Sequence, residues 1–99
     1  MVGGTELNFN KSKRIISSYS KSLTHMGKLG SGQLTKFTNQ ILICGILYSI
    51  SEAYLFSKKN NLDQKKIFNA LKNGAANSWQ FTNRYPTLIK KRINCVIIF

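Results

Sequence analysis

The sequence predicts an all-α fold, in which one long helix is followed by shorter packed helices and preceded by a short β segment. The first observation is the stretch from Gly32 to Lys59, which contains no proline and places apolar residues at helical spacing along its length. The second is a series of helix start and stop residues after position 60. The chain has 99 residues, which is enough for one small domain.

Two short elements are predicted before the long helix. Residues 1–4 lead from two apolar residues into two glycines, as at the end of a strand or in the turn after it. The loose apolar spacing of residues 5–21 predicts a helix, and the weak alternation of residues 23–26 predicts a short strand.

Two further helices are predicted after the long helix. Asp63 is placed to cap the first of them, and Gly74 is placed to stop it. Asn77 or Ser78 can cap a second, short helix that runs through Arg84, and Pro86 is expected to end it or to change the direction of the chain. Residues 89–99 show no cap, turn or periodicity, so we interpret them as an atypical tail.

The strongly basic composition raises the question of a nucleic-acid partner. Fifteen Lys and Arg oppose three Asp and Glu, which gives a formal net charge of +12. The lysines are scattered, however, and no run reaches the roughly five or six like charges of a nucleic-acid-binding tail. We therefore expect a solvated surface and no nucleic-acid partner. A small basic interaction or nucleic-acid-binding protein remains the alternative.

Cysteine and apolar patterns argue against a metal site and a membrane span. Cys44 and Cys95 are far apart, and neither has a partner at metal-ligand spacing. Cys44 lies in an apolar run and is interpreted as a small core residue, which fits a reducing cytoplasm. The most apolar stretch, residues 41–50, is about half of the roughly 20 residues needed to cross a bilayer. We expect a cytoplasmic protein with neither metal nor membrane contact.

The entrance of the long helix combines glycines with polar side chains. Glycines let backbone amides approach a ligand closely, and a helix N-terminus favours an anion such as a carboxylate or phosphate. One turn further, Gln33, Lys36 and either Asn39 or Gln40 share one face of the helix. The spacing fits neither a Walker loop nor a Rossmann fingerprint. By spacing alone, an ordinary glycine turn before a helix with a surface lysine remains an alternative.

The same segment resembles the catalytic segment of the β-hydroxyacid dehydrogenase family, which includes 3-hydroxyisobutyrate dehydrogenase, tartronate semialdehyde reductase and, more distantly, 6-phosphogluconate dehydrogenase. The matching pattern is Gly27-x-x-Gly30-x-Gly32-x-x-x-Lys36-x-x-Asn39-Gln40. Further similar segments follow the family's order and cover about residues 1 to 88: Val2-Gly3-Gly4, Ser51-Glu52-Ala53, Asn61-Leu62-Asp63, and Gly74-Ala75-Ala76-Asn77-Ser78-Trp79 with Asn83 and Pro86.

The resemblance implies roles for individual residues. Lys36 would be the catalytic acid/base, which exchanges a proton with the substrate oxygen while a hydride moves to or from NAD or NADP. The implied substrate is a small β-hydroxyacid. The residues that would bind it are Gly30, Ser31, Gly32, Asn39, Gln40 and Trp79. For Trp79, an ordinary core aromatic is an equally good interpretation.

The resemblance also implies a domain organisation. Residues 1–29 would be the end of a Rossmann cofactor domain, and residues 30–88 the incomplete start of a helical C-terminal domain like that of 6-phosphogluconate dehydrogenase. Residues 89–99 do not resemble the family. We therefore expect a fragment of an NAD(P)-dependent oxidoreductase that has its catalytic lysine but is inactive alone. The family's long helix packs against a second subunit, which implies a dimer or other homo-oligomer formed through residues 32–59.

Overall fold

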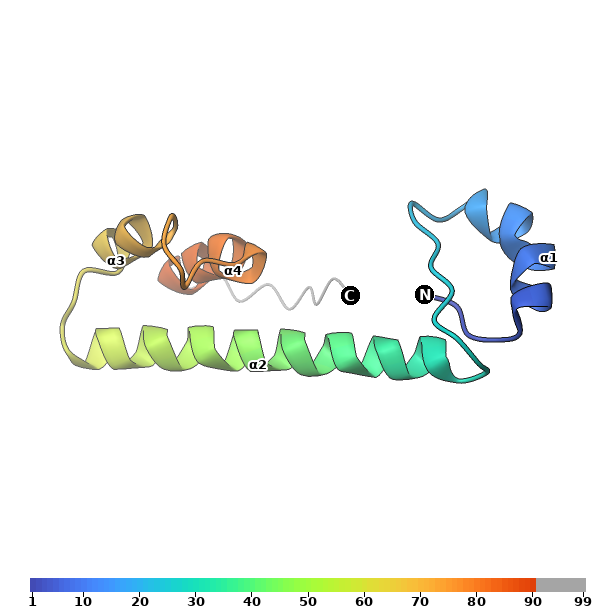
Figure 1. Ribbon diagram of the computed structural model, residues 1–99. Coiled ribbons are helices and arrows are strands. Elements are labelled where there is room, and N and C mark those ends of the chain that lie inside the picture. The colour runs from blue at the N-terminus through green and yellow to red at the C-terminus, as the bar shows by residue number, and fades with distance from the viewer. Residues whose placement is uncertain (91–99) are drawn as a thin grey trace. The chain divides into compact units, whose positions relative to one another are not determined.

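The structure, a computed structural model, describes residues 1–90, and these residues form four helices (Figure 1). The helices are α1 (Glu6–Ser17), α2 (Ser31–Lys59), α3 (Gln64–Leu71) and α4 (Trp79–Ile89). The predicted all-α class is confirmed. In the described part of the chain, the expected β segment is an isolated parallel bridge between Val2 and His25.

The chain divides into two compact units, Met1–Leu42 and Ile43–Phe99, and α2 contributes residues to both. This division follows compactness alone, so the domain boundaries predicted at 29–30 and 88–89 stay predictions. The atypical tail predicted over residues 89–99 lies outside the described residues from position 91 onward.

Helix α1 begins at a threonine cap and ends earlier than expected. The Thr5 side chain accepts a hydrogen bond from the backbone N–H of Asn8 at 3.3 Å. The predicted helix over 5–21 is too long, because α1 ends at Ser17. The Ser18 hydroxyl and its backbone N–H both donate to the Ile15 carbonyl oxygen, at 2.6 and 3.2 Å. Serine side chains that bond nearby carbonyls in this way compete with continuation of a helix.

Helix α2 covers the predicted long helix and ends at a left-handed residue. Asn61 has a φ of 57°, which non-glycine residues adopt rarely and asparagine more readily than most. The backbone N–H of Leu62 donates to the Ser57 carbonyl at 3.0 Å, and that of Asn61 to the Lys58 carbonyl at 3.1 Å. This pair of bonds is a Schellman motif, which satisfies carbonyls that the helix end would leave unbonded.

Both later helices begin at the predicted capping residues. One carboxylate oxygen of Asp63 accepts hydrogen bonds from the backbone N–H groups of Lys65 and Lys66, at 2.9 and 3.0 Å. The bond from Lys66, then that from Lys65 and the two lysine charges, hold the pKa of Asp63 below its ordinary value. The Ser78 hydroxyl accepts a hydrogen bond from the backbone N–H of Phe81 at 3.0 Å. Side-chain capping therefore sets where α3 and α4 start.

The ends of these helices differ from the prediction. Helix α3 ends at Leu71, before the expected stop at Gly74. Pro86 lies inside α4, so the prediction that Pro86 ends this helix is wrong. Proline removes a backbone donor and crowds the preceding turn. Helix α4 nevertheless continues to Ile89, and both Leu88 and Ile89 pack against the core, so burial of this last turn offsets the loss.

The core of the second unit is aromatic and joins α2, α3 and α4. Ile50, Phe81 and Tyr85 are buried, and the partly buried residues around them are Tyr54, Ile67, Phe68, Leu88 and Ile89. The Phe81 and Tyr85 ring centroids are 4.9 Å apart, and those of Phe68 and Phe81 are 5.7 Å apart. These separations are in the range of favourable aromatic pairs.

A buried polar cluster lies within this apolar core. The Tyr85 side chain is 1% exposed, and its hydroxyl donates to the Gln64 Oε1 atom at 2.7 Å. The Ser57 hydroxyl lies 3.0 Å from the same oxygen and 3.4 Å from the Tyr85 hydroxyl. Buried polar groups are tolerated when they are hydrogen-bonded. This cluster therefore fixes the position of α3 and α4 on the last turns of α2.

Within residues 1–90, much of the apolar surface of α2 is exposed. Cys44 is exposed, so the expectation that it is a core residue is wrong. Helix α2 is also long and apolar enough to cross a membrane, since an 18-residue window has a mean hydropathy of 1.3. Core helices of soluble proteins meet the same criterion, so length and composition alone do not assign this helix to a membrane.

Candidate functional site at the start of the long helix

The N-terminal segment pairs with the chain that leads into α2. The backbone N–H of Val2 donates to the Thr24 carbonyl at 2.9 Å, and that of Met26 donates to the Val2 carbonyl at 2.8 Å. The Gly4 N–H donates to the Gly27 carbonyl at 2.8 Å. These bonds hold residues 1–4 parallel to residues 24–27, so the segment predicted as a strand end and the predicted strand over 23–26 are neighbours.

This pairing brings Gly3 directly against the first turn of α2. A Cβ atom on Gly3 would lie 2.8 Å from the Lys28 carbonyl oxygen and 2.9 Å from the Gly32 nitrogen. A Cβ atom on Gly32 would lie 2.9 Å from the Gly3 nitrogen. Any larger residue at either position would push the two backbones apart. Gly3 and Gly32 are thus required for the close packing of these two backbone segments.

Two other glycines make the turn into α2. Gly27 and Gly30 have φ values of 111° and 90°, which side-chain-bearing residues rarely adopt. Gly30 directly precedes α2 and has no side-chain oxygen with which to cap the helix. The amides of the first turn and the positive end of the helix dipole therefore favour an anionic ligand at this point.

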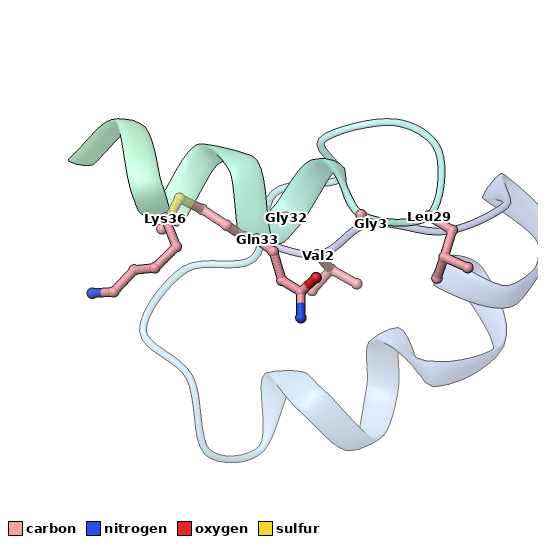
Figure 2. A pocket seen from close by; sticks show the side chains of 8 residues that line it. Val2, Gly3, Leu29, Gly32, Gln33 and Lys36 are labelled. Atoms are coloured by element: carbon pink, nitrogen blue, oxygen red, sulfur yellow. The ribbon is translucent and has the colours of Figure 1, made fainter. Parts of the chain in front are cut away.

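A cleft of about 770 Å³ lies beside this turn. Its lining residues are Met1, Val2, Gly3, Leu29, Gly30, Gly32, Gln33 and Lys36. Gln33 and Lys36 project from the same side of α2 (Figure 2), as their three-residue spacing predicts. Among the residues that line the cleft, Lys36 provides a cationic side chain. The structure thus brings three of the predicted site residues, Gly30, Gly32 and Lys36, into one cleft.

The other predicted site residues lie outside this lining. The Ser31 hydroxyl is near Gly27, 3.4 Å from where a Cβ of that glycine would be. Asn39 and Gln40 are partly buried one turn beyond Lys36, and the Gln40 Oε1 atom is buried with no hydrogen-bond partner. Trp79 is the first residue of α4, belongs to the second unit and is 63% exposed. Their assigned roles stay predictions.

Sequence reasoning missed part of the lining. Met1, Val2, Gly3 and Leu29 line the cleft but were not among the predicted site residues, and Gln33 was placed on the same helix face as Lys36 without an assigned role. Val2 and Gly3 belong to the Val2-Gly3-Gly4 segment, whose adjacent glycines indicated a strand end or a turn but no part in a cleft. The apolar side chains of the other residues could not have been distinguished from core residues.

His25 is the single histidine of the sequence, and its contacts hold the N-terminal segment in place. Its Nε2 atom lies 2.7 Å from the Gly4 carbonyl oxygen, to which it donates, and its ring stacks on Phe9 with centroids 4.8 Å apart. In residues 1–90, there is no group of three or more His, Cys, Asp or Glu that could hold a metal ion. Among the residues that line the cleft, Lys36 carries the titratable side chain.

Comparison with known proteins decides the family. Residues 30–94 match a family model described as the NAD-binding domain of NADP-dependent 3-hydroxyisobutyrate dehydrogenase. The chain belongs to the 3-hydroxyisobutyrate dehydrogenase family. The matched residues include Gly30, Gly32 and Lys36 of the cleft. Use of NAD(P) is implied for this family by the family description and by the names of related dehydrogenases.

Individual related proteins are similar over most of the chain. An uncharacterised oxidoreductase of Shewanella frigidimarina is 42% identical over 88 residues, which are 89% of this chain and 30% of that protein. The 2-hydroxy-3-oxopropionate reductase of Escherichia coli is 34% identical over 94 residues, 95% of this chain and 32% of that protein. A probable mitochondrial 3-hydroxyisobutyrate dehydrogenase of Dictyostelium discoideum is 32% identical over 92 residues, 91% of this chain and 29% of that protein. The chain thus spans less than a third of the length of these relatives.

Proposed function

We propose that this chain supplies the catalytic lysine and the substrate-anion site of an NAD(P)-dependent oxidoreductase that acts on the CH–OH group of a small β-hydroxyacid. The observation that carries the proposal is the cleft at the start of α2, where a glycine-lined helix N-terminus lies beside Lys36. Membership of the 3-hydroxyisobutyrate dehydrogenase family supports the same assignment. The chain alone is proposed to be inactive, since it spans only about 30% of its relatives.

The cleft fits a small acid together with the reactive end of a nicotinamide cofactor. Its volume of about 770 Å³ is typical of small-molecule sites. Gly3 and Gly32 pack against each other's backbone and together form part of the wall of the cleft. When bound, the nicotinamide would accept or return the hydride.

The residues of this chain would bind the acid and move the proton. The amides of Gly32 and Gln33, at the positive end of α2, would hold the substrate carboxylate. The Lys36 amine would then take the proton from the substrate hydroxyl in oxidation and return it to the carbonyl oxygen in reduction. Asn39 and Gln40 would hydrogen-bond the substrate.

A chimera tests the assignment of Lys36. Residues 1–90 would replace the aligned part of the E. coli 2-hydroxy-3-oxopropionate reductase, and NADH-dependent reduction would be measured. Lys36→Ala is expected to lower kcat by about 10²–10⁴-fold, which is the usual contribution of a positioned proton-transfer group. Lys21→Ala, an exposed lysine of the same unit, is the matched control. Equal turnover of the two variants would remove Lys36 from the mechanism.

A binding measurement on the intact chain is independent of chimera folding. In amide NMR spectra titrated with 3-hydroxyisobutyrate, shifts are expected at Gly3 and at residues 30–36. Lys36→Met should weaken them, whereas Lys21→Met should not. Shifts spread evenly over lysine-rich segments would instead indicate unspecific attraction of an anion to a chain of net charge +12.

Because the chain has a formal net charge of +12, nucleic-acid binding is the second candidate function. Such binding would lose affinity steeply between 50 and 200 mM salt, roughly 10³-fold or more if six phosphates are contacted. Affinity for duplex DNA that is equally weak at both salt concentrations would exclude it.

A further inference from the structure

A second cavity lies between α3 and α4 and is called here the α3–α4 pocket. Its volume is about 220 Å³. The lining residues come from one side of α3 and from the end of α4, and they are Lys65, Phe68, Asn69, Pro86, Ile89 and Lys90. The pocket belongs to the second compact unit and shares no residue with the cleft at the start of α2.

The inner part of the α3–α4 pocket is apolar. Phe68 and Ile89 line it, and both also pack against the buried core that contains Phe81 and Tyr85. Both side chains are only partly buried, so each keeps apolar surface that a ligand can cover. Pro86, which is partly buried as well, adds a ring without an N–H donor. This part of the pocket therefore favours an aliphatic group.

The mouth of the α3–α4 pocket is positively charged. Lys65 and Lys90 line the pocket and are exposed, so their ammonium groups stay in water at its edge. Residues 60–90 contain five Lys and Arg against one acidic residue, Asp63. The Asp63 carboxylate accepts hydrogen bonds from the backbone amides of Lys65 and Lys66, where it caps α3. The positive excess favours a ligand with an anionic end group.

The size and lining of the pocket restrict the ligand further. A water molecule occupies about 30 Å³ in the liquid, so about 220 Å³ holds roughly seven groups of that size. Hexanoate matches this size, with its chain inside and its carboxylate at the mouth. A hydroxyl on its third carbon would enter the apolar part, where burial of an unpaired hydroxyl is costly. The pocket therefore discriminates against the β-hydroxyacids proposed for the cleft.

We propose that the α3–α4 pocket binds a short, unsubstituted aliphatic carboxylate. Its hydrocarbon chain lies against Phe68, Pro86 and Ile89, and its carboxylate lies between Lys65 and Lys90. The inference does not depend on the chemistry proposed for the cleft, because the two sites have no residue in common. The bound acid contacts both α3 and the last turn of α4, and so stabilises the second unit.

Titration of the intact chain with hexanoate tests the pocket. In amide NMR spectra at about 150 mM salt, which screens unspecific attraction, shifts are expected at Phe68, Asn69 and Ile89 and not at residues 30–36. The expected Kd is millimolar, which is usual for a ligand of about eight non-hydrogen atoms. Pentanoate and butanoate should each bind about fourfold more weakly than the acid that is one methylene longer. Hexylamine, which has the opposite charge, should bind at least about fivefold more weakly than hexanoate.

Two pairs of lysine substitutions separate the pocket from the overall charge. Lys65→Met combined with Lys90→Met should weaken hexanoate binding by about two- to thirtyfold, the effect of two exposed ion pairs. Lys59→Met combined with Lys66→Met changes the net charge equally at exposed positions outside the lining, and should leave the Kd unchanged. Equal weakening by both pairs would overturn the proposal in favour of unspecific attraction.

Filling the pocket tests its apolar part. Asn69→Trp places a large ring at an exposed lining position and should abolish binding, whereas Asn73→Trp, an exposed position outside the lining, should not. Far-UV circular dichroism verifies that both variants keep their helix content. The proposal is overturned by shifts that persist in Asn69→Trp, by a Kd that does not depend on chain length, or by hexylamine binding as tightly as hexanoate. Absence of shifts at Phe68 and Ile89 in the intact chain would also overturn it, because the pocket would then be closed to small acids.

Discussion

Removal of one hydroxyl group from the buried polar cluster tests whether this cluster stabilises the second unit. In Tyr85→Phe, the ring keeps its contacts with Phe81 and Phe68, and the lost hydroxyl takes with it the 2.7 Å hydrogen bond to Gln64 and the longer 3.4 Å contact with the Ser57 hydroxyl. A net hydrogen bond contributes about 0.5–1.5 kcal/mol. Gln64 Oε1 retains the Ser57 hydroxyl at 3.0 Å, so it is not left unpaired. We expect a loss of about 1 kcal/mol in the free energy of unfolding.

Two reference substitutions bracket this value. Phe81→Ala empties the core beside Tyr85 and should cost about 3–5 kcal/mol. Tyr19→Phe removes a hydroxyl from a side chain that is 76% exposed and should change stability by less than about 0.5 kcal/mol. Urea unfolding followed by far-UV circular dichroism gives all three values, with unchanged denaturant slopes. If Tyr85→Phe matches Tyr19→Phe, the cluster does not stabilise the fold, and if it matches Phe81→Ala, the hydrogen-bond reasoning is wrong.

Three other predictions concern glycine packing, helix capping and pH. Gly32→Ala should destabilise the chain by about 1–3 kcal/mol through overpacking against Gly3, whereas Gly45→Ala, where space is open, should raise thermal stability. Ser78→Ala should lower the free energy of unfolding by about 1 kcal/mol, and Ser78→Asp should restore it, as measured by urea unfolding. Because the folded-state pKa of Asp63 is lowered, its contribution is present above the unfolded pKa of about 3.9 and is lost as the pH falls below it. Thermal melts at pH 6 and pH 3 should show a smaller difference for Asp63→Asn, and an unchanged difference would show that this cap is not the acid-sensitive group.

The fold was predictable where local chemistry decides the structure. Asp63 and Ser78 cap helices because their side chains reach nearby backbone amides, and this depends only on short sequence spacing. Apolar residues at helical spacing predicted a helix from Gly32 to Lys59, and α2 begins one residue earlier and ends at the same residue. Pro86 was misjudged because its effect depends on what the last turn of α4 packs against, which spacing does not reveal.

Only the glycines and the lysine of the candidate site were predictable from the sequence. Gly30, Gly32 and Lys36 share one short segment, so their proximity follows from the chain itself. Val2 and Gly3 reach the cleft through pairing with residues 24–27, more than twenty positions away. Non-local pairing of this kind leaves only a weak trace in a single sequence. Cys44 was misassigned for a related reason, because apolar neighbours do not reveal which of two faces is covered.

Ser57 has consequences for where this chain can tolerate insertions and deletions. Its carbonyl oxygen accepts the bond that ends α2, and its hydroxyl belongs to the buried cluster with Gln64 and Tyr85. One residue added between Ile50 and Ser57 would rotate Ile50 by about 100° relative to Ser57 and its partners, so Ile50 would leave the core that it forms with Phe81 and Tyr85. One residue added among 73–77, where the side chains are exposed and the chain is not helical, would leave this packing intact. Length variation among relatives should therefore accumulate in that loop and be excluded from the last turns of α2.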